Sequence, residues 1–127
     1  MDNSFGKEYK LCSRILIDKL FEQGKRFRFD PFSLVYLNVE NDIQGPFQIL
    51  ISVPKKQFKK AHDRNYVKRC IREIIRKNKQ YLIHQQPNNN KLILAVVYNF
   101  NQQITFAEME QKLVKALERL SSKLKQN

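Results

Sequence analysis

The 127-residue sequence predicts a single α+β domain, residues 1–127, in which helices pack on a small mixed sheet. Short runs of branched and aromatic residues, typical of strands, alternate with longer segments whose apolar residues recur every three or four positions, as in helices. A chain of this length is usual for one domain and buries a core without disulfide or metal staples. We expect the helices to cover one side of the sheet.

The first half of the chain predicts one helix followed by extended segments. Ser13 is suited to cap a helix that continues through Gln23, and Gly24 is well placed to end it. Residues 32–39 and 47–53 are rich in aromatic and branched side chains, which is typical of strands. The link between these two strands carries turn-forming residues.

The second half predicts a helix, a buried strand and a closing helix. The helix begins near residue 63 and continues to about residue 79, and the nearly continuous apolar run at 91–98 indicates a strand buried on both faces. Thr105 and Glu108 form a capping-box pattern that opens a last helix, which continues to about Leu124. Its predicted core stripe comprises Phe106, Met109, Leu113, Leu117, Leu120 and Leu124.

The charge of the chain is large and concentrated. The chain has 24 Lys and Arg against 12 Asp and Glu, a net charge of +12. Residues 55–79 hold eleven basic and two acidic residues, a net charge of +9, so the rest of the chain carries only +3. Such a concentration is expected of a nucleic-acid footprint, with an anionic membrane surface as the other natural partner. Cys12 and Cys70 form no disulfide framework, and neither a secretory signal nor a membrane span is evident, so a cytoplasmic location is expected.

On a helical wheel, residues 64–79 separate into an apolar face and an adjacent basic face. Val67, Ile71, Ile74 and Ile75 share the apolar face. The basic face carries Asn65, Lys68, Arg69, Arg72, Arg76 and Lys79. A solvated face without a ligand is the simpler interpretation. However, Glu73 lies off this face on the wheel, and like charges one turn apart repel by about 0.2–0.5 kcal/mol per pair, so a polyanionic partner is favoured.

The sequence around this helix resembles the signature of the bacterial ribonuclease P protein family. Residues 55–73 read Lys-Lys-Gln-Phe-Lys-Lys-Ala-His-Asp-Arg-Asn-Tyr-Val-Lys-Arg-Cys-Ile-Arg-Glu, and Ser-Val-Pro precedes them. The segment Leu-Phe-Glu-Gln-Gly-Lys at 20–25 is similar to the end of the family's first helix. The resemblance implies an α-β-β-β-α-β-α fold whose signature helix lies in a left-handed crossover, against the usual hand of such connections.

The same resemblance implies a division of labour with RNA. The chain would be the non-catalytic protein subunit of ribonuclease P, an endoribonuclease that removes the 5′ leader of precursor tRNA. The ribonuclease P RNA would carry out the hydrolysis with magnesium, while the protein would hold no cofactor, metal or catalytic residue and would be monomeric before assembly. In agreement, His62 and His84 lack partners at metal-ligand spacing, and no carboxylates form an acid–base pair.

The resemblance also assigns two sets of residues. Those expected to contact the catalytic RNA are Arg64, Asn65, Lys68, Arg69, Arg72 and Arg76. Those expected to hold the leader, in a cleft between the first helix and the sheet, are Ile17, Phe21, Val35, Lys55 and Lys56. Tyr66 stands where a basic residue is common, and Ile17 and Val35 stand where aromatic residues are common. Phe21 is therefore the one clear cleft aromatic, although its spacing also fits a core position.

Several alternatives remain open. Residues 25–29, Lys-Arg-Phe-Arg-Phe, fit either a nucleic-acid-gripping strand or an edge strand with its phenylalanines inward. If Phe21 is core, Phe27, Phe29 and Tyr36 are the next candidates to hold the leader. The runner-up function is a ribosomal-type or double-stranded-RNA-binding module without an enzyme partner. A membrane-surface protein would require an exposed apolar helix face, which we instead expect to be in the core.

Overall fold

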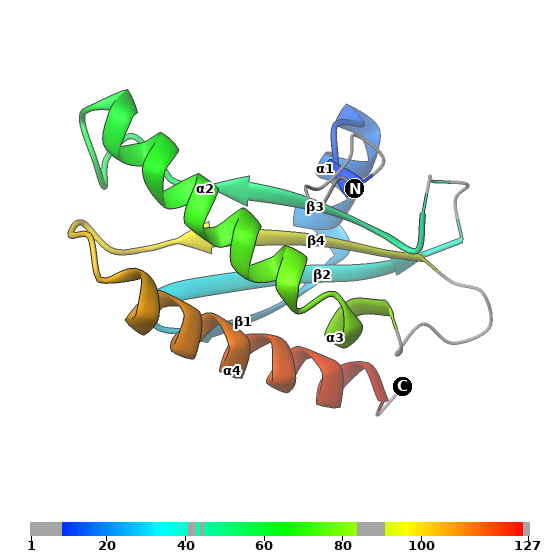
Figure 1. Ribbon diagram of the computed structural model, residues 1–127. Coiled ribbons are helices and arrows are strands. Elements are labelled where there is room, and N and C mark those ends of the chain that lie inside the picture. Colours follow the sequence, from blue (N-terminus) through cyan, green and yellow to red (C-terminus); the bar gives the residue numbers. More distant parts are fainter. Residues whose placement is uncertain (1–8, 41–42, 44, 84–90, 126–127) are drawn as a thin grey trace, which may run out of the picture.

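The computed structural model describes residues 9–40, 43, 45–83 and 91–125 (Figure 1). The elements in chain order are α1 (Arg14–Gln23), β1 (Lys25–Phe29), β2 (Phe32–Val39), β3 (Phe47–Ser52), α2 (Ala61–Lys77), α3 (Gln80–Ile83), β4 (Lys91–Tyr98) and α4 (Phe106–Lys125). The α+β class and the predicted order of elements are confirmed. The short helix α3 is additional, and α2 begins and ends two residues earlier than the prediction. His84 lies outside the described residues.

The sheet is mixed, with strand order β1-β2-β4-β3. β1 pairs with β2 and β2 with β4 in antiparallel fashion, whereas β3 and β4 are parallel. In Figure 1, β3 and β4 both run to the left, β4 lies below β3, and the connecting helix α2 passes in front of the sheet. This arrangement makes the β3-α2-β4 crossover left-handed, as the family resemblance implied.

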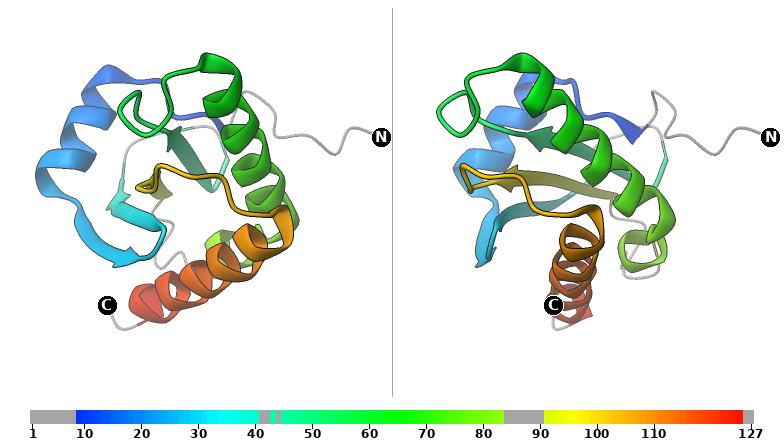
Figure 2. Two further views of the ribbon diagram at one scale, coloured as in Figure 1. Left: turned by 90° about the vertical axis from the view of Figure 1, so that its left-hand side faces the viewer. Right: turned by 60° about the vertical axis from the view of Figure 1, so that its left-hand side comes forward.

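The helices occupy both faces of the sheet, so the expectation that they cover one side is wrong. α2 and α4 enclose the larger core on one face, where Leu94 and Val96 of β4 meet Ile71 and Leu117. α1 packs on the opposite face through Leu16 and Leu20, against residues of β2 and β4 that include Val35, Ile93 and Ala95 (Figure 2). The run Leu92–Val96 of β4 is accordingly buried throughout, as predicted for a strand covered on both faces.

Local interactions explain where the helices begin and end. The hydroxyl of Ser13 accepts a hydrogen bond from the backbone N–H of Leu16, and Thr105 does the same for Glu108, so both predicted caps are present. Gly24 ends α1 in an extended conformation, with φ of −70°. Its role is close approach, because a Cβ there would lie 2.4 Å from the Leu20 carbonyl oxygen and 3.0 Å from that of Tyr36.

The two edge strands of the sheet are protected differently. β1 exposes Lys25, Arg26 and Arg28. Beside β3, Lys10 forms an isolated parallel bridge with Ile49, and the backbone N–H of Leu11 donates to the Ile49 carbonyl at 2.8 Å. This short segment continues the hydrogen bonding of the sheet beyond its last strand.

Candidate nucleic-acid interface

Helix α2 presents its basic residues beside a fully buried apolar face. Val67, Ile71, Ile74 and Ile75 are each 0% exposed and pack in the larger core, as predicted. Asn65, Arg69 and Arg72 are exposed, and Lys68 is half-buried. None of the cations at 68, 69 and 72 forms an ion pair within the described part of the chain. Three neighbouring cations without counter-charges make this side of α2 strongly positive.

Two of the predicted RNA-contacting arginines are engaged by the protein itself. Arg76 donates two hydrogen bonds to the carboxylate of Glu73, at 2.9 and 2.6 Å, and its side chain is only 23% exposed. This hydrogen bonding lowers the pKa of Glu73 and raises that of Arg76. Glu73, which the helical wheel placed off the basic face, therefore neutralises the charge of Arg76 on that face. The i,i+3 spacing of the two residues is the sequence signal for this pair.

Arg64 braces the loop that leads into α2. Its guanidinium donates to the carbonyl oxygens of Phe58 and Lys59 at 2.8 and 3.1 Å. The helix N-cap residue, Lys60, makes no capping hydrogen bond through its side chain. Arg64 thus fixes the approach to the signature helix while part of its side chain remains accessible.

Tyr66, which replaces a commonly basic residue, lies on the surface with 37% of its area exposed. A hydrogen bond with the Cys70 thiol one turn away raises the pKa of the Tyr66 hydroxyl. Arg69 lies close enough to oppose this effect by its charge. The position therefore adds an aromatic ring, rather than a cation, to the basic side of the helix.

A hollow of about 360 Å³ lies on the face of the sheet that carries α1. Its lining consists of Phe21, Arg26, Phe27, Arg28, Ser33, Val35, Val97 and Asn99. Two of the predicted leader-binding residues, Phe21 and Val35, are thus brought together here. Phe21 is half-buried and packs against the smaller core, whereas Val35 is almost fully buried and contributes to the floor.

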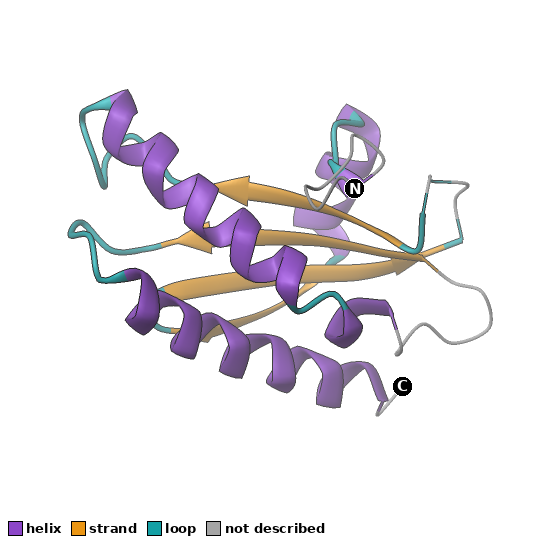
Figure 3. Cartoon of the chain, in the orientation of Figure 1, coloured by secondary structure: helices purple, strands orange, loops and turns teal. Residues whose placement is uncertain are grey.

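The other predicted leader-binding residues lie around this hollow rather than in its lining. Ile17 is half-buried and packs against the same small core as Phe21. Lys55 and Lys56 are exposed on the loop that follows β3. Figure 3 shows that this loop leaves the sheet at the end where β3 and β4 both finish. Ser52 at the end of β3 pairs with Val97, which lines the hollow, so the loop starts at the same end of the sheet as the hollow. The two lysines add positive charge to this end.

The edge-strand interpretation of β1 is confirmed. Phe27 and Phe29 pack against the larger core, where Lys123 and Arg119 of α4 lie over their rings at 5.2 and 5.0 Å from the centroids. Tyr36 is buried in that same core, on the face away from α1. Phe29 and Tyr36 therefore do not line the hollow beside α1, whereas Phe27 reaches its edge.

Two polar residues of the hollow, Ser33 of β2 and Asn99 just beyond β4, were missed by sequence reasoning. Arg26 and Arg28 of β1 also line the hollow. They belong to the segment considered as a nucleic-acid-gripping strand, where Arg and Phe alternate, and residues two apart share a face of a strand. Asn99 gave no comparable signal, because only the pairing of β2 with β4 brings it close to Ser33. The side-chain amide of Asn99 donates a hydrogen bond to the Ser33 hydroxyl.

Across the described ranges, no three His, Cys, Asp or Glu side chains gather closely enough to hold a metal ion. His62 is exposed at the first turn of α2. No helix among the described residues is long and apolar enough to cross a membrane.

A concentrated cationic helix face and a hollow lined by aromatic and basic side chains are both features of proteins that bind nucleic acid. The model of the Ribonuclease P family matches residues 5–121, and the chain therefore belongs to the ribonuclease P protein family. It is similar to the ribonuclease P protein component of Porphyromonas gingivalis, with 38% identity over 76 residues; that match covers 60% of this chain and little more than half, 56%, of the relative. The corresponding protein of Mycoplasma mobile is 31% identical over 116 residues, which cover 91% of this chain and 93% of that one.

Solved structures of RNase P proteins have the same fold as this chain. The RNase P protein of Thermotoga maritima superposes with a TM-score of 0.69 at 25% identity, covering 87% of this chain and 96% of that chain. The RNase P protein of Staphylococcus aureus superposes with a TM-score of 0.72 and covers 88% of this chain and 94% of its own. At 22% identity, the Staphylococcus aureus likeness shows the fold alone.

Proposed function

We propose that this protein is the protein subunit of ribonuclease P, which assists endonucleolytic removal of the 5′ leader from precursor tRNA. The observation that carries the proposal is the row formed by Lys68, Arg69 and Arg72 on α2, three cations without a carboxylate partner in the described chain. Their charge is available to the phosphates of a large RNA, and release of the counterions of that RNA would drive binding.

In this proposal the two regions of the protein bind different RNA segments. The exposed side of α2, with Asn65 beside the three cations, contacts the catalytic RNA, and Arg64 orients the loop before it. The hollow beside α1 holds the single-stranded leader, with Phe21 offering a ring to a base and Arg26 and Arg28 facing the phosphates. Lys55 and Lys56 are exposed on the loop that joins β3 to α2, and in this proposal they add positive charge for the RNA.

The chemical step belongs, in this proposal, to the RNA. The ribonuclease P RNA would hold the magnesium ions that activate water and stabilise the leaving oxygen. The protein contributes by holding the leader and the catalytic RNA in one fixed arrangement, which lowers the entropic cost of the reaction. It would act in the cytoplasm, as a monomer before assembly.

Reconstitution with a bacterial ribonuclease P RNA tests the proposal. Cleavage of precursor tRNA at low magnesium should rise strongly when the protein is added, and the protein should bind precursor tRNA more tightly than mature tRNA. A module for duplex RNA would instead bind a matched duplex at least as well and leave cleavage unchanged, because such modules recognise duplexes by shape. That result would reject the proposed function.

A further inference from the structure

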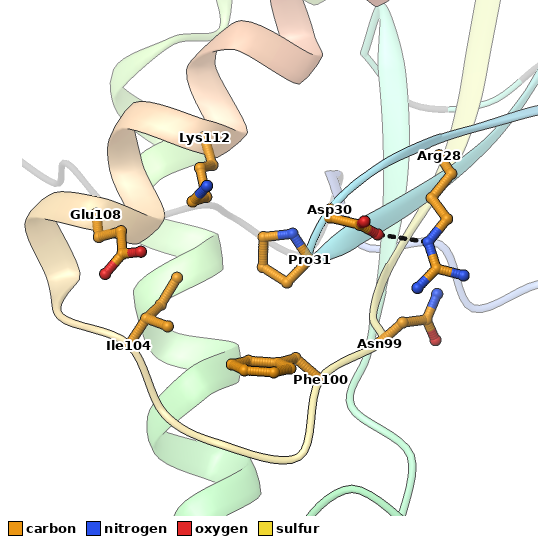
Figure 4. A pocket seen from close by; sticks show the side chains of 8 residues that line it. All are labelled: Arg28, Asp30, Pro31, Asn99, Phe100, Ile104, Glu108 and Lys112. Atoms are coloured by element: carbon orange, nitrogen blue, oxygen red, sulfur yellow. Dashed lines mark hydrogen bonds and ion pairs between the residues drawn. The ribbon is translucent and has the colours of Figure 1, made fainter.

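A second hollow, of about 300 Å³, lies beyond the first at the same end of the sheet (Figure 4). It is enclosed by the turn between β1 and β2, the segment that follows β4, and the first turns of α4. Its lining consists of Arg28, Asp30, Pro31, Asn99, Phe100, Ile104, Glu108 and Lys112. This volume is at the lower end of the range of roughly 300–1,000 Å³ found for pockets that hold small organic groups.

One wall of the second hollow is apolar. Pro31 is buried, and Phe100 and Ile104 are half-buried. Figure 4 shows the rings of Pro31 and Phe100 near one another, with Ile104 beside them. The Phe100 ring also meets Tyr98 edge-on, with 6.5 Å between centroids, so it is held by the core while one side remains accessible. A flat aromatic group would find a stacking surface on this wall.

The rim of the second hollow is polar and carries both charges. The Arg28 side chain donates to the Asp30 carboxylate at 2.5 Å. Glu108 is exposed, and its carboxylate forms no ion pair in the described residues. Only its backbone N–H takes part in the helix cap, by donating to the Thr105 hydroxyl. Lys112 lies one turn further along α4. The α4 side of the rim therefore offers a carboxylate acceptor and a cation one turn apart, and the paired Arg28 and Asp30 lie across the hollow.

The two hollows adjoin each other. Arg28 and Asn99 line both of them. The Asn99 amide is held at this junction by its hydrogen bond to Ser33, which lines only the first hollow. An RNA strand in the first hollow would therefore have Arg28 and the second hollow next to it.

We propose that the second hollow holds one nucleobase of the single-stranded RNA whose neighbouring nucleotides occupy the first hollow. This inference rests on the proposed function and adds a subsite to it. The base stacks against Phe100 and Pro31, and Arg28 and Lys112 face the adjoining phosphates. The Glu108 carboxylate accepts a hydrogen bond from an exocyclic amino group. This favours cytosine, adenine or guanine over uracil, which has no amino group and offers a carboxylate only its ring N3–H.

The experiment uses the reconstituted holoenzyme and precursor tRNAs whose leaders are lengthened one nucleotide at a time. For the wild-type protein, affinity should increase at the leader position that reaches the second hollow. Phe100→Leu keeps an apolar side chain against Tyr98 but removes the ring, and should lower affinity by about fivefold or more only for leaders that include this position. A melting curve close to wild type establishes that the variant is folded.

A second pair of variants tests base choice. Glu108→Gln should weaken the discrimination against uracil at that position, because an amide also donates hydrogen bonds. Glu118→Gln makes the same change on the same helix outside the second hollow and should leave the discrimination intact. Cytidine monophosphate alone should bind far more weakly than the leader, and equal affinity would identify a site for free nucleotides instead.

The outcomes separate this inference from the proposed function. If folded Phe100→Leu matches wild type at every leader length, while the wild type still prefers longer leaders, the second hollow is not a leader subsite. If the wild-type holoenzyme does not distinguish leaders at all, the proposed function and this inference both fail.

Discussion

Removing two cations from α2 tests whether this helix contacts RNA phosphates. Arg69 and Arg72 are exposed and unpaired in the described structure, whereas the apolar residues between them are fully buried. Replacing both with Ala removes charge without disturbing the core, and Ala favours the helix. We expect the free energy of unfolding to change by no more than about 0.5 kcal/mol, as is usual for surface substitutions.

The magnitude follows from counterion release. Each phosphate neutralised by a cation contributes about 0.7–0.9 to the slope of log affinity against log salt concentration. If both side chains contact phosphates, the slope for the ribonuclease P RNA should become shallower by about 1.4–1.8 in the double variant. Arg76→Ala should change this slope less than Arg69→Ala or Arg72→Ala alone, because the Arg76 guanidinium is already paired with Glu73.

Binding titrations at several salt concentrations provide the assay. The matched control is Lys115→Ala with Lys125→Ala, which removes two exposed cations from α4. This control should leave the slope nearly unchanged if the contacts are local to α2. An unchanged slope in the α2 variant, or an equal loss in the α4 control, would refute the assignment of the catalytic-RNA face.

Three further predictions follow from the described contacts. Phe21→Ala should lower the affinity for precursor tRNA relative to mature tRNA. Because Phe21 is half-buried, the change should lower the free energy of unfolding by less than the roughly 3–5 kcal/mol expected for a fully buried Phe. A larger loss of stability with an unchanged affinity ratio would make Phe21 a core residue. Gly24→Ala should destabilise the protein by about 1–3 kcal/mol in chemical denaturation, because its Cβ would clash with the Leu20 carbonyl; wild-type stability would contradict that reasoning. Purified protein without RNA should not cleave precursor tRNA, and cleavage that survives nuclease-free controls would overturn the proposed division of labour.

The sequence predicted the elements well because their signals are local. The strand at 91–98 and the apolar stripe of α4 follow from hydrophobic periodicity, which depends on neighbours along the chain. The sequence predicted the bounds of α1, but it contained no information on which face of the sheet Leu16 and Leu20 would meet. The hand of the crossover came from the family resemblance, since general rules favour the opposite hand.

The candidate site was predicted less completely because much of it depends on long-range pairing. The basic face of α2 is encoded in one helix and was found, although the pairing of Arg76 with Glu73 was not anticipated. The lining of the two hollows combines Arg28 with Asn99, which are more than half the chain apart and come together only when β1, β2 and β4 form one sheet. Arg28 belongs to the alternating segment at 25–29, but no motif marked Asn99 or linked the two residues.

The bridge between Lys10 and Ile49 has a consequence for aggregation. An edge strand with free N–H and carbonyl groups is a template on which another chain can add a strand. The backbone of Leu11 occupies part of that template on β3, and Leu11 is itself 1% exposed. Proteolysis after Leu11 would leave the Ile49 carbonyl unpaired and expose apolar surface beside it, so a trimmed protein should self-associate at concentrations at which the longer chain does not.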